Sequence, residues 1–429
     1  MSQADSDRPG RFLWLLPGMR PPITLPRREE LIFLLVGTTI LFSGYDLYVF
    51  GLALPQIQRT LHIPEDAAGL TAMYFRVATL GALLIAPLAD IFGRRRLLLF
   101  TVFGETLMTL LSAFAQTYPQ FVWAQIGARV FGYCEELLCF VVIAEEIDPG
   151  ARGWSIGLLG AMNGTGAGLA ALAFAVVNLL PFGWRSLYVI GGSALLVLAL
   201  FRRLLPETRR FELRRQEIGR LENRLSAGWD VSRRLIKEHP GRLFATLLTA
   251  GGLGFAFAPA TVLMAKYLQD VHHYRPYQIS LLYMFGGFVA VAGNIVAGRL
   301  SDRFGRKRTL FLCALLSASA FAVFFSGVDG RLLPLAWIVA IFGYLTSDSL
   351  VAGYSAEIFP TAYRATASTL RYVVATLCGA AGLGLEGVLY DWFGAHGPAI
   401  ATFLAFSPIA LIAILFLPES AGRTLEEVA

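Results

Sequence analysis

The sequence is poor in charged residues and in cysteine, and each shortage excludes a class of protein. Only 15% of the 429 residues are charged, whereas 56% are hydrophobic, and the mean hydropathy is +0.60. A soluble domain cannot bury so large an apolar fraction, whereas a lipid bilayer favours it. The four cysteines show no paired spacing and the five histidines form no ligand pattern. The sequence therefore predicts neither a disulfide framework nor a metal site.

Other signals are missing as well. The sequence has no motif of an enzyme active site, so we expect no enzymatic activity and no cofactor. The first 30 residues are polar, basic and rich in proline, and they lack the short apolar segment of a secretory signal. Lysine is scarce beside arginine, a bias that is typical of GC-rich bacterial genomes. We therefore expect a bacterial protein whose first apolar run is kept as a helix.

Long apolar runs are what the sequence has in abundance. About twelve runs are close to the roughly 20 residues that a helix needs to cross about 30 Å of hydrocarbon. They cover residues 31–57, 67–89, 97–115, 121–144, 156–180, 187–204, 243–268, 279–300, 310–328, 332–356, 365–389 and 399–417. We predict an all-α polytopic membrane protein with 12 transmembrane helices.

A nine-residue stretch occurs twice and indicates an internal repeat. Leu88–Arg96 (LADIFGRRR) returns as Leu300–Arg308 (LSDRFGRKR), and Phe131–Tyr133 returns as Phe342–Tyr344. Repeats of this kind are typical of secondary transporters. The sequence therefore predicts two pseudo-symmetric six-helix bundles.

The repeat and the polar segments divide the chain into five parts. We expect a cytoplasmic N-terminal tail (1–30), an N-terminal six-helix bundle (31–204), a cytoplasmic linker with short helices (205–241), a C-terminal six-helix bundle (242–417) and a cytoplasmic C-terminal tail (418–429). The mixed charges of the linker favour a solvated tether over a regulatory domain.

Basic residues set the expected orientation. The stretches 94–96, 202–242 and 299–308 are rich in arginine and fall on one side when the helices are counted. Because cytoplasmic loops carry the excess of Lys and Arg, both termini should be cytoplasmic and the protein should lie in the bacterial inner membrane. The net charge of +6 then reflects topology, and we expect no nucleic-acid partner.

These patterns resemble a known family across the whole chain. The doubled D-x-x-G-R-[RK]-[RK] turn resembles the signature of the major facilitator superfamily. Gly44–Asp46, Gly127–Arg129, the Glu357-x-x-Pro360-x-x-x-Arg364 pattern and the segment 418–427 resemble the sugar-porter group and its relatives that carry organic ions. The resemblance implies the major facilitator fold and transport by alternating access.

The resemblance also implies a gating network, in which the two turns and their acidic partners lock the halves together when the transporter faces outward. The implied residues are Asp90, Gly93, Arg94, Glu146 and Arg152 in the first half, and Asp302, Gly305, Arg306, Glu357 and Arg364 in the second. The alternative is that these charged turns only fix topology. Ala86 and Ile91 depart from the family pattern, so we expect the first lock to be the looser one.

Charged residues inside predicted spans are candidates for function, because each is costly in a membrane. Asp46 lies near the middle of the first span and Arg129 lies well inside the fourth. By resemblance, these two residues form the carboxylate–arginine pair that couples proton uptake to transport. The alternative is a static ion pair that holds the two helices together.

Further polar and aromatic residues are candidates for the substrate cavity. They are Glu135, Glu136, Arg76, Asn163, Asn294, Tyr45 and Tyr344. Glu135 and Glu136 point about 100° apart on one helix, so one of them could contact substrate while the other packs against a polar neighbour. The two adjacent acids favour a basic or hydroxyl-bearing substrate. Arg76 and Arg371 instead favour an anionic substrate, although Arg371 could also extend to the cytoplasmic surface.

The sequence predicts a proton-coupled symporter of a small organic solute. Sugar porters carry a Gln-Gln-x-x-Gly-x-Asn pattern in helix 7, whereas this region contains no amide from Gly251 to Pro259. An organic ion or an aromatic metabolite therefore fits better than a hexose. The alternatives are a proton-driven exporter of drugs or metabolites and a membrane sensor that does not transport. We expect a monomer whose partners are the small-molecule substrate, the proton and the lipid bilayer.

Overall fold

The computed structural model describes residues 20–202, 231–327 and 330–420. Within a few helical stretches it describes the backbone and not the side chains, which applies to Asp90, Asp302 and residues 290–299. Most of the tails and most of the linker that the sequence predicts lie outside the described residues. Contacts divide the chain into two compact units. Unit 1 comprises residues 1–56 and 78–219, and unit 2 comprises residues 57–77 and 220–429.

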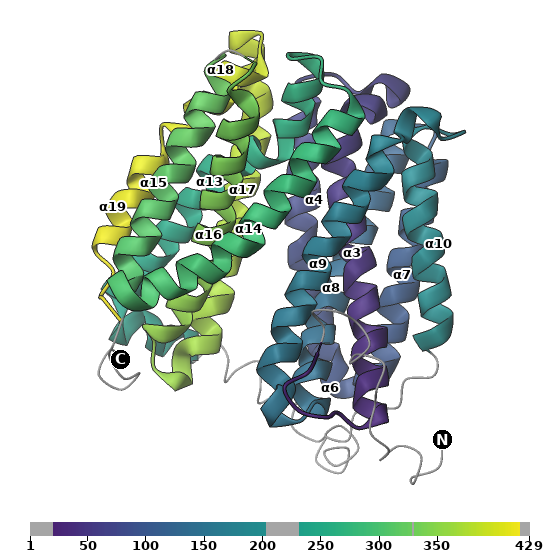
Figure 1. Cartoon of the computed structure of the whole chain (residues 1–429). Coiled ribbons are helices and arrows are strands. Elements are labelled where there is room, and N and C mark those ends of the chain that lie inside the picture. The colour runs from purple at the N-terminus through teal and green to yellow at the C-terminus, as the bar shows by residue number, and fades with distance from the viewer. Residues whose placement is uncertain (1–19, 203–230, 328–329, 421–429) are drawn as a thin grey trace. The chain divides into compact units, whose positions relative to one another are not determined.

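The described part of unit 1 is built of long helices and two helices of four residues (Figure 1). They are most of α3 (Arg27–Leu61), followed by α5 (Ala82–Ile85), α6 (Ala89–Phe92), α7 (Arg94–Phe114), α8 (Tyr118–Glu146), α9 (Pro149–Ala175) and α10 (Trp184–Arg202). Helix α7 packs against α8 and α10. Buried apolar residues of α3, α7, α8 and α9 form one core, which includes Phe33, Leu98, Leu138 and Leu159.

The described part of unit 2 is likewise built of helices (Figure 1). It contains α4 (Ala67–Ala78) up to Val77, α13 (Pro240–Asp270), α14 (Pro276–Phe304), α15 (Arg306–Phe325), α16 (Leu333–Glu357), α17 (Thr361–Phe393), α18 (His396–Leu404) and α19 (Ser407–Leu415). Helix α13 packs along α17, and α15 packs along α16.

As far as the structure describes them, the twelve predicted spans each coincide with a helix or with consecutive helical pieces. Ten stretches of the described residues are long and apolar enough to cross a membrane. The other two predicted runs form α8 and α14, each 29 residues long. Helix α8 differs from the ten in carrying three charged residues, Arg129, Glu135 and Glu136, in its middle. The described residues thus have the all-α architecture that the sequence predicts.

One glycine in the glycine-rich helix α9 marks a close helix contact. A Cβ at Gly166 would lie 1.9 Å from the carbonyl oxygen of Leu41, so only a residue without a side chain lets α9 approach α3 here. Gly160, Gly164 and Gly168 have open space where a Cβ would be. Of these four glycines, only Gly166 is therefore required for the close approach of α9 to α3.

Candidate functional site

Unit 1 contains a small polar cavity among α3, α7, α8 and α9. Its volume is about 20 Å³, which is room for a water molecule. The residues that line it are Ser43, Asp46, Leu47, Glu105, Ala128, Arg129, Gly132, Tyr133, Glu136 and Asn163. Four of the predicted site residues therefore meet around one cavity: Asp46, Arg129, Glu136 and Asn163.

Asp46 and Arg129 are close together, but their contact differs from a direct ion pair. The Nη2 atom of Arg129 donates to the backbone carbonyl oxygen of Asp46 at 3.3 Å and to Oε1 of Gln125 at 3.1 Å. The Asp46 carboxylate accepts from the hydroxyl of Thr109 at 3.3 Å. Asp46 is 2% exposed and Arg129 is 5% exposed. The carboxylate is thus held beside the guanidinium and is not locked to it.

Glu105 of α7 shares this cavity and was not among the predicted site residues. It is 1% exposed, and its Oε2 atom accepts from the Ser43 hydroxyl at 3.0 Å. A Cβ at position 132 would lie 2.9 Å from Oε1 of Glu105, so Gly132 makes room for the carboxyl group. The signal in the sequence was the single acidic residue inside the third predicted span.

The adjacent acids Glu135 and Glu136 have different surroundings, as their angular separation on the helix predicts. Glu135 is fully buried and lies 2.9 Å from Nη1 of Arg202, which is also fully buried. The Nη2 atom of Arg202 donates to Sγ of Cys139 at 3.2 Å. Glu136 instead accepts from Nδ2 of Asn163 at 3.4 Å and lines the cavity. The structure therefore gives Glu136 the cavity position and pairs Glu135 with Arg202.

Arg202 is a residue that sequence reasoning missed. It ends α10 and was counted only as one of the basic residues that fix the orientation of the chain. Its partner lies 67 positions earlier by residue number, on α8. A pairing at such a distance along the chain depends on how α8 and α10 sit in the bundle, which no local pattern reveals.

The two predicted tyrosines serve packing in this structure. The hydroxyl of Tyr45 donates to the carbonyl oxygen of Leu187 at 2.9 Å, and its ring lies where a Cβ at Gly191 would be. Tyr344 of α16 makes an edge-on contact with Phe257 of α13, with ring centroids 6.0 Å apart. The side chain of Asn294, also predicted for the cavity, lies outside the described part of the chain.

Arg76 belongs to unit 2 and does not line the cavity of unit 1. Its guanidinium lies against α17, where a Cβ at Gly379 would be within 2.9 Å of three guanidinium atoms. Arg371 is also on α17, and the charged residue that acts on it most strongly is Asp348 of α16. Unit 2 therefore carries two basic side chains along α17.

The second repeat turn has the ion pair that the sequence predicts. Gly305 has a φ of 104°, and the chain reverses there between α14 and α15. The Nη2 and Nε atoms of Arg306 each lie 3.1 Å from an oxygen of Glu357, which is the two-pronged geometry that favours strong pairing. Glu419 accepts from the backbone N–H of Arg306 at 2.7 Å, at the start of α15, where a carboxylate stabilises the helix. Nε and Nη2 of Arg364 have no hydrogen-bond partner among the described residues.

The first repeat turn is built differently. Gly93 has a φ of 96° and reverses the chain between α6 and α7. Arg94 pairs with Glu145 at 3.1 Å, whereas the predicted acid, Glu146, pairs with Arg28 at 2.9 Å. Consecutive residues of a helix point about 100° apart, so a one-residue difference in register changes the partner. Arg152 donates to the carbonyl oxygen of Ile147 at 3.5 Å. The side chains of Asp90 and Asp302 lie outside the described residues.

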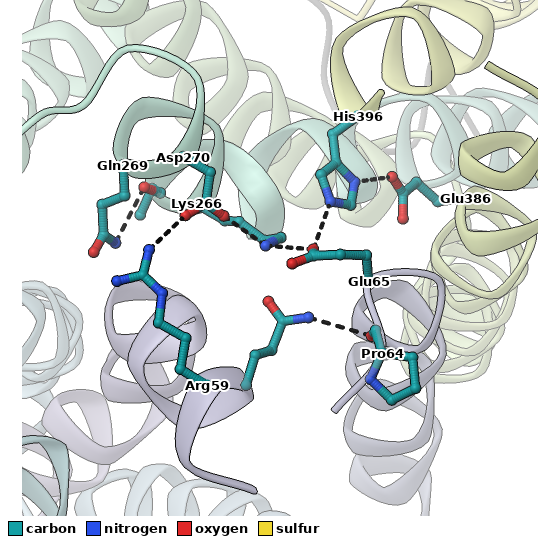
Figure 2. A network of polar contacts seen from close by, with 10 residues as sticks. Arg59, Pro64, Glu65, Lys266, Gln269, Asp270, Glu386 and His396 are labelled. Carbon is teal, nitrogen blue, oxygen red and sulfur yellow. Dashed lines mark hydrogen bonds and ion pairs between the residues drawn. The ribbon is translucent and has the colours of Figure 1, made fainter. Parts of the chain in front are cut away.

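A second group of ionisable residues lies in unit 2 (Figure 2). We call Glu65, Lys266, Asp270, Glu386 and His396 the unit 2 cluster. The Nζ atom of Lys266 lies 2.6 Å from Glu65 and 2.6 Å from Asp270. His396 contacts Glu386 at 2.7 Å and Glu65 at 3.3 Å. Lys266 and Glu386 are almost completely buried.

Glu65 connects this cluster to the loop that follows α3. It lies in the short connection between α3 and α4, and its side chain is 48% exposed. The hydrogen bond from His396, followed by that from Lys266, lowers the pKa of Glu65 to about 2 despite partial burial. The contacts hold residues 57–77 against α13 and α18. Lys266 and Glu386 are charged residues within predicted spans, but no local pattern in the sequence brings them together.

Comparison with known proteins agrees with this architecture. The family model of the Major Facilitator Superfamily matches residues 36–298 and 278–427. The probable 4-methylmuconolactone transporter of Cupriavidus pinatubonensis is 28% identical over 407 residues, which cover 90% of each protein. The cis,cis-muconate transport protein of Acinetobacter baylyi is 25% identical over 358 residues, which cover 81% of this chain and 84% of that protein.

Solved structures have the same fold. A D-xylose-proton symporter matches with a TM-score of 0.74 at 18% identity, over 92% of this chain and 99% of that one. The chain therefore belongs to the major facilitator superfamily and is a membrane transporter and not an enzyme.

Proposed function

We propose that this transporter is a proton-coupled symporter that takes up a small organic acid by alternating access. The observation that carries the proposal is the position of Asp46, which is buried at a water-sized cavity with Arg129 at its backbone. A carboxyl group in a membrane interior is costly when ionised and is stabilised by a nearby guanidinium. A small movement of one group against the other therefore changes whether Asp46 holds a proton.

The surroundings of Asp46 suit such a change. Its carboxylate accepts from Thr109, whereas the guanidinium of Arg129 donates to Gln125 and to the backbone. Arg129 can turn from these neutral acceptors to the Asp46 carboxylate without leaving the cavity. Glu136 and Asn163 at the same cavity would then transmit the presence of substrate to the proton site.

An organic acid is the substrate class that the charges of unit 2 favour. Arg371 lies ten residues into α17, or about 15 Å along the helix axis. Its Nε atom is buried without a hydrogen-bond partner among the described residues. A guanidinium in this position suits a carboxylate, which it can bind through two N–H groups. The two relatives named above carry muconate or a muconolactone, which are compounds of this class.

The residue types in the middle of α13 disfavour a hexose as the substrate. The stretch Gly251–Pro259 contains glycine, alanine, leucine, phenylalanine and proline, and it offers no side-chain hydrogen-bonding group to a sugar hydroxyl.

We propose in addition that both termini are cytoplasmic, that the membrane is the bacterial inner membrane and that the protein works as a monomer. The predicted boundaries of the two six-helix bundles, 31–204 and 242–417, and the gating role of the repeat turns belong to this proposal.

Transport assays in proteoliposomes test the proposed function. Vesicles with an acidic exterior and a neutral interior should accumulate labelled cis,cis-muconate, and a protonophore should abolish the accumulation. Arg371→Gln should raise the KM for the acid, while Asp391→Asn at an exposed helix end should leave it unchanged. Expulsion of the acid against its gradient would instead identify an exporter. Binding without any exchange of labelled for unlabelled acid would identify a sensor.

A further inference from the structure

The buried charges of unit 1 do not balance. Asp46, Glu105 and Glu135 are each at most 2% exposed, whereas the buried cations near them are Arg129 and Arg202. Arg202 lies against Glu135 at 2.9 Å. Glu136, a fourth carboxyl group at the cavity, is partly exposed and accepts from Asn163, so it is less costly to ionise than the three buried ones. If the three buried carboxyl groups were all ionised, one negative charge would remain without a cation inside the membrane-spanning part of the protein. Such a charge is costly enough that one carboxyl group must hold a proton.

Glu105 is the carboxyl group with the least support for a negative charge. Among the described residues, the Ser43 hydroxyl donates to it and no cation forms an ion pair with it. Its electrostatic neighbours, in order of effect, are Glu135, Asp46 and then Arg129. Arg202 of α10 also interacts electrostatically with Glu105, more weakly than it does with Glu135. Two of these four charged groups are therefore carboxylates. Of the two cations, Arg202 is paired with Glu135, and Arg129 donates to Gln125 and to the backbone of Asp46.

The cavity gives this proton a route to Asp46. Glu105 and Asp46 both line it, and it has room for a water molecule between them. The glycine at position 132 of α8 leaves space for the Glu105 carboxyl group of α7, which any side chain there would displace. A bridging water can accept a proton from one carboxylic acid and donate another to the opposite carboxylate.

We propose that Glu105 is a second proton-binding residue of this transporter, which holds the proton while Asp46 is ionised and returns it across the cavity. In the transfer the O–H bond on Glu105 breaks, an O–H bond forms on Asp46 through the water, and no electron moves. The inference rests on the proposed proton coupling and adds a residue to it. Asp46 then need not exchange its proton directly with bulk water.

The test compares Glu105→Gln with wild type in proteoliposomes. We expect gradient-driven accumulation of labelled cis,cis-muconate to fall about tenfold, because an amide at this position can neither release nor take up a proton. Exchange of labelled for unlabelled muconate, which needs no net proton movement, should stay within about twofold of wild type. Glu105→Asp should recover part of the accumulation, because it keeps a carboxyl group. Asp391→Asn serves as the surface control.

A spectroscopic measurement keeps the proposal testable if the variant folds poorly. Infrared difference spectra of wild type should show a protonated carboxylic acid band, which Ser43→Ala should shift and Glu105→Asp should alter. Absence of any effect of Ser43→Ala on this band, or unchanged accumulation in Glu105→Gln, would overturn the role of Glu105. If wild type itself moves no protons with its substrate, the proposed function fails instead.

Discussion

The guanidinium of Arg129 donates to the backbone carbonyl oxygen of Asp46, at 3.3 Å, and not to its carboxylate. The carboxylate has Thr109 as its hydrogen-bond donor, and the same guanidinium nitrogen also reaches Gln125. A guanidinium that lies near a carboxylate without forming a direct ion pair with it suits a carboxyl group that must gain and lose a proton. A permanent bidentate pair would hold Asp46 ionised.

The first prediction concerns the shape of the cation at position 129. Arg129→Lys keeps the charge, but a lysine ammonium has neither the planar fork nor the reach of a guanidinium. We expect accumulation of substrate to fall about tenfold, the equivalent of about 1.4 kcal/mol, while the protein remains folded. Gradient-driven uptake and thermal unfolding in detergent measure the two effects separately. Uptake equal to that of wild type would show that only the charge matters.

The second prediction concerns the buried pair of Glu135 and Arg202. Removing Glu135 by Glu135→Leu leaves a guanidinium that cannot lose its charge, and we expect a loss of about 3 kcal/mol of stability. Arg202→Met should cost less, because the remaining carboxyl group can take up a proton. The double variant should recover most of the loss, because an apolar pair of similar volume replaces two buried charges.

Thermal and denaturant unfolding of the four proteins in one detergent measures this cycle. Losses that simply add in the double variant would show that the two side chains are energetically independent.

The third prediction compares the two repeat turns. Both glycines have positive φ, so Gly93→Ala and Gly305→Ala should each cost about 1–3 kcal/mol in backbone strain. A Cβ at Gly305 would also lie 2.6 Å from Oε2 of Glu419, which caps α15. We therefore expect Gly305→Ala to be the more damaging for transport and stability.

The matched control for this prediction is Glu419→Gln. If Gly305→Ala acts partly by displacing Glu419, then the two substitutions combined should cost less than the sum of their separate effects. Strictly additive decreases in unfolding temperature would show that Gly305→Ala does not act by displacing Glu419.

The fourth prediction concerns acid stability of the unit 2 cluster. His396 and Lys266 lower the pKa of Glu65 to about 2, below its usual value of about 4.3. A carboxyl group with a lowered pKa stabilises the fold above its usual pKa, and this contribution is lost as pH falls towards 2. Glu65→Gln should therefore lower the unfolding temperature at pH 6 and reduce its further fall between pH 5 and pH 3. A Glu65→Gln variant whose acid sensitivity matches wild type would contradict the assignment.

Much of the fold was predictable because each span is a local property of composition. About twenty consecutive apolar residues require a helix in a bilayer, whatever their neighbours are. The turns at Gly93 and Gly305 could likewise be located, since a chain reversal between charged residues has a short sequence signature. The partner of Arg306 also followed from the repeat.

Pairing between distant helices was less predictable. Arg94 takes Glu145 and not Glu146, a choice that depends on how α8 ends against α7. The contact of Arg202 with Glu135 needs the rotation of two helices about their axes to be known. The cavity gathered Asp46, Arg129, Glu136 and Asn163, whereas Tyr45 and Tyr344 pack against helices. Hydrophobicity places a residue in the membrane, but only packing decides which neighbours it meets.

Proton movement accompanying substrate transport tests the central claim most directly. Purified protein is placed in vesicles containing a pH-sensitive dye, without an imposed gradient, and cis,cis-muconate is added outside. The account predicts that the vesicle interior acidifies as substrate enters, that a protonophore removes the signal and that Asp46→Asn abolishes it while exchange of labelled substrate continues. Substrate entry without acidification in wild type, or undiminished acidification in Asp46→Asn, would contradict it.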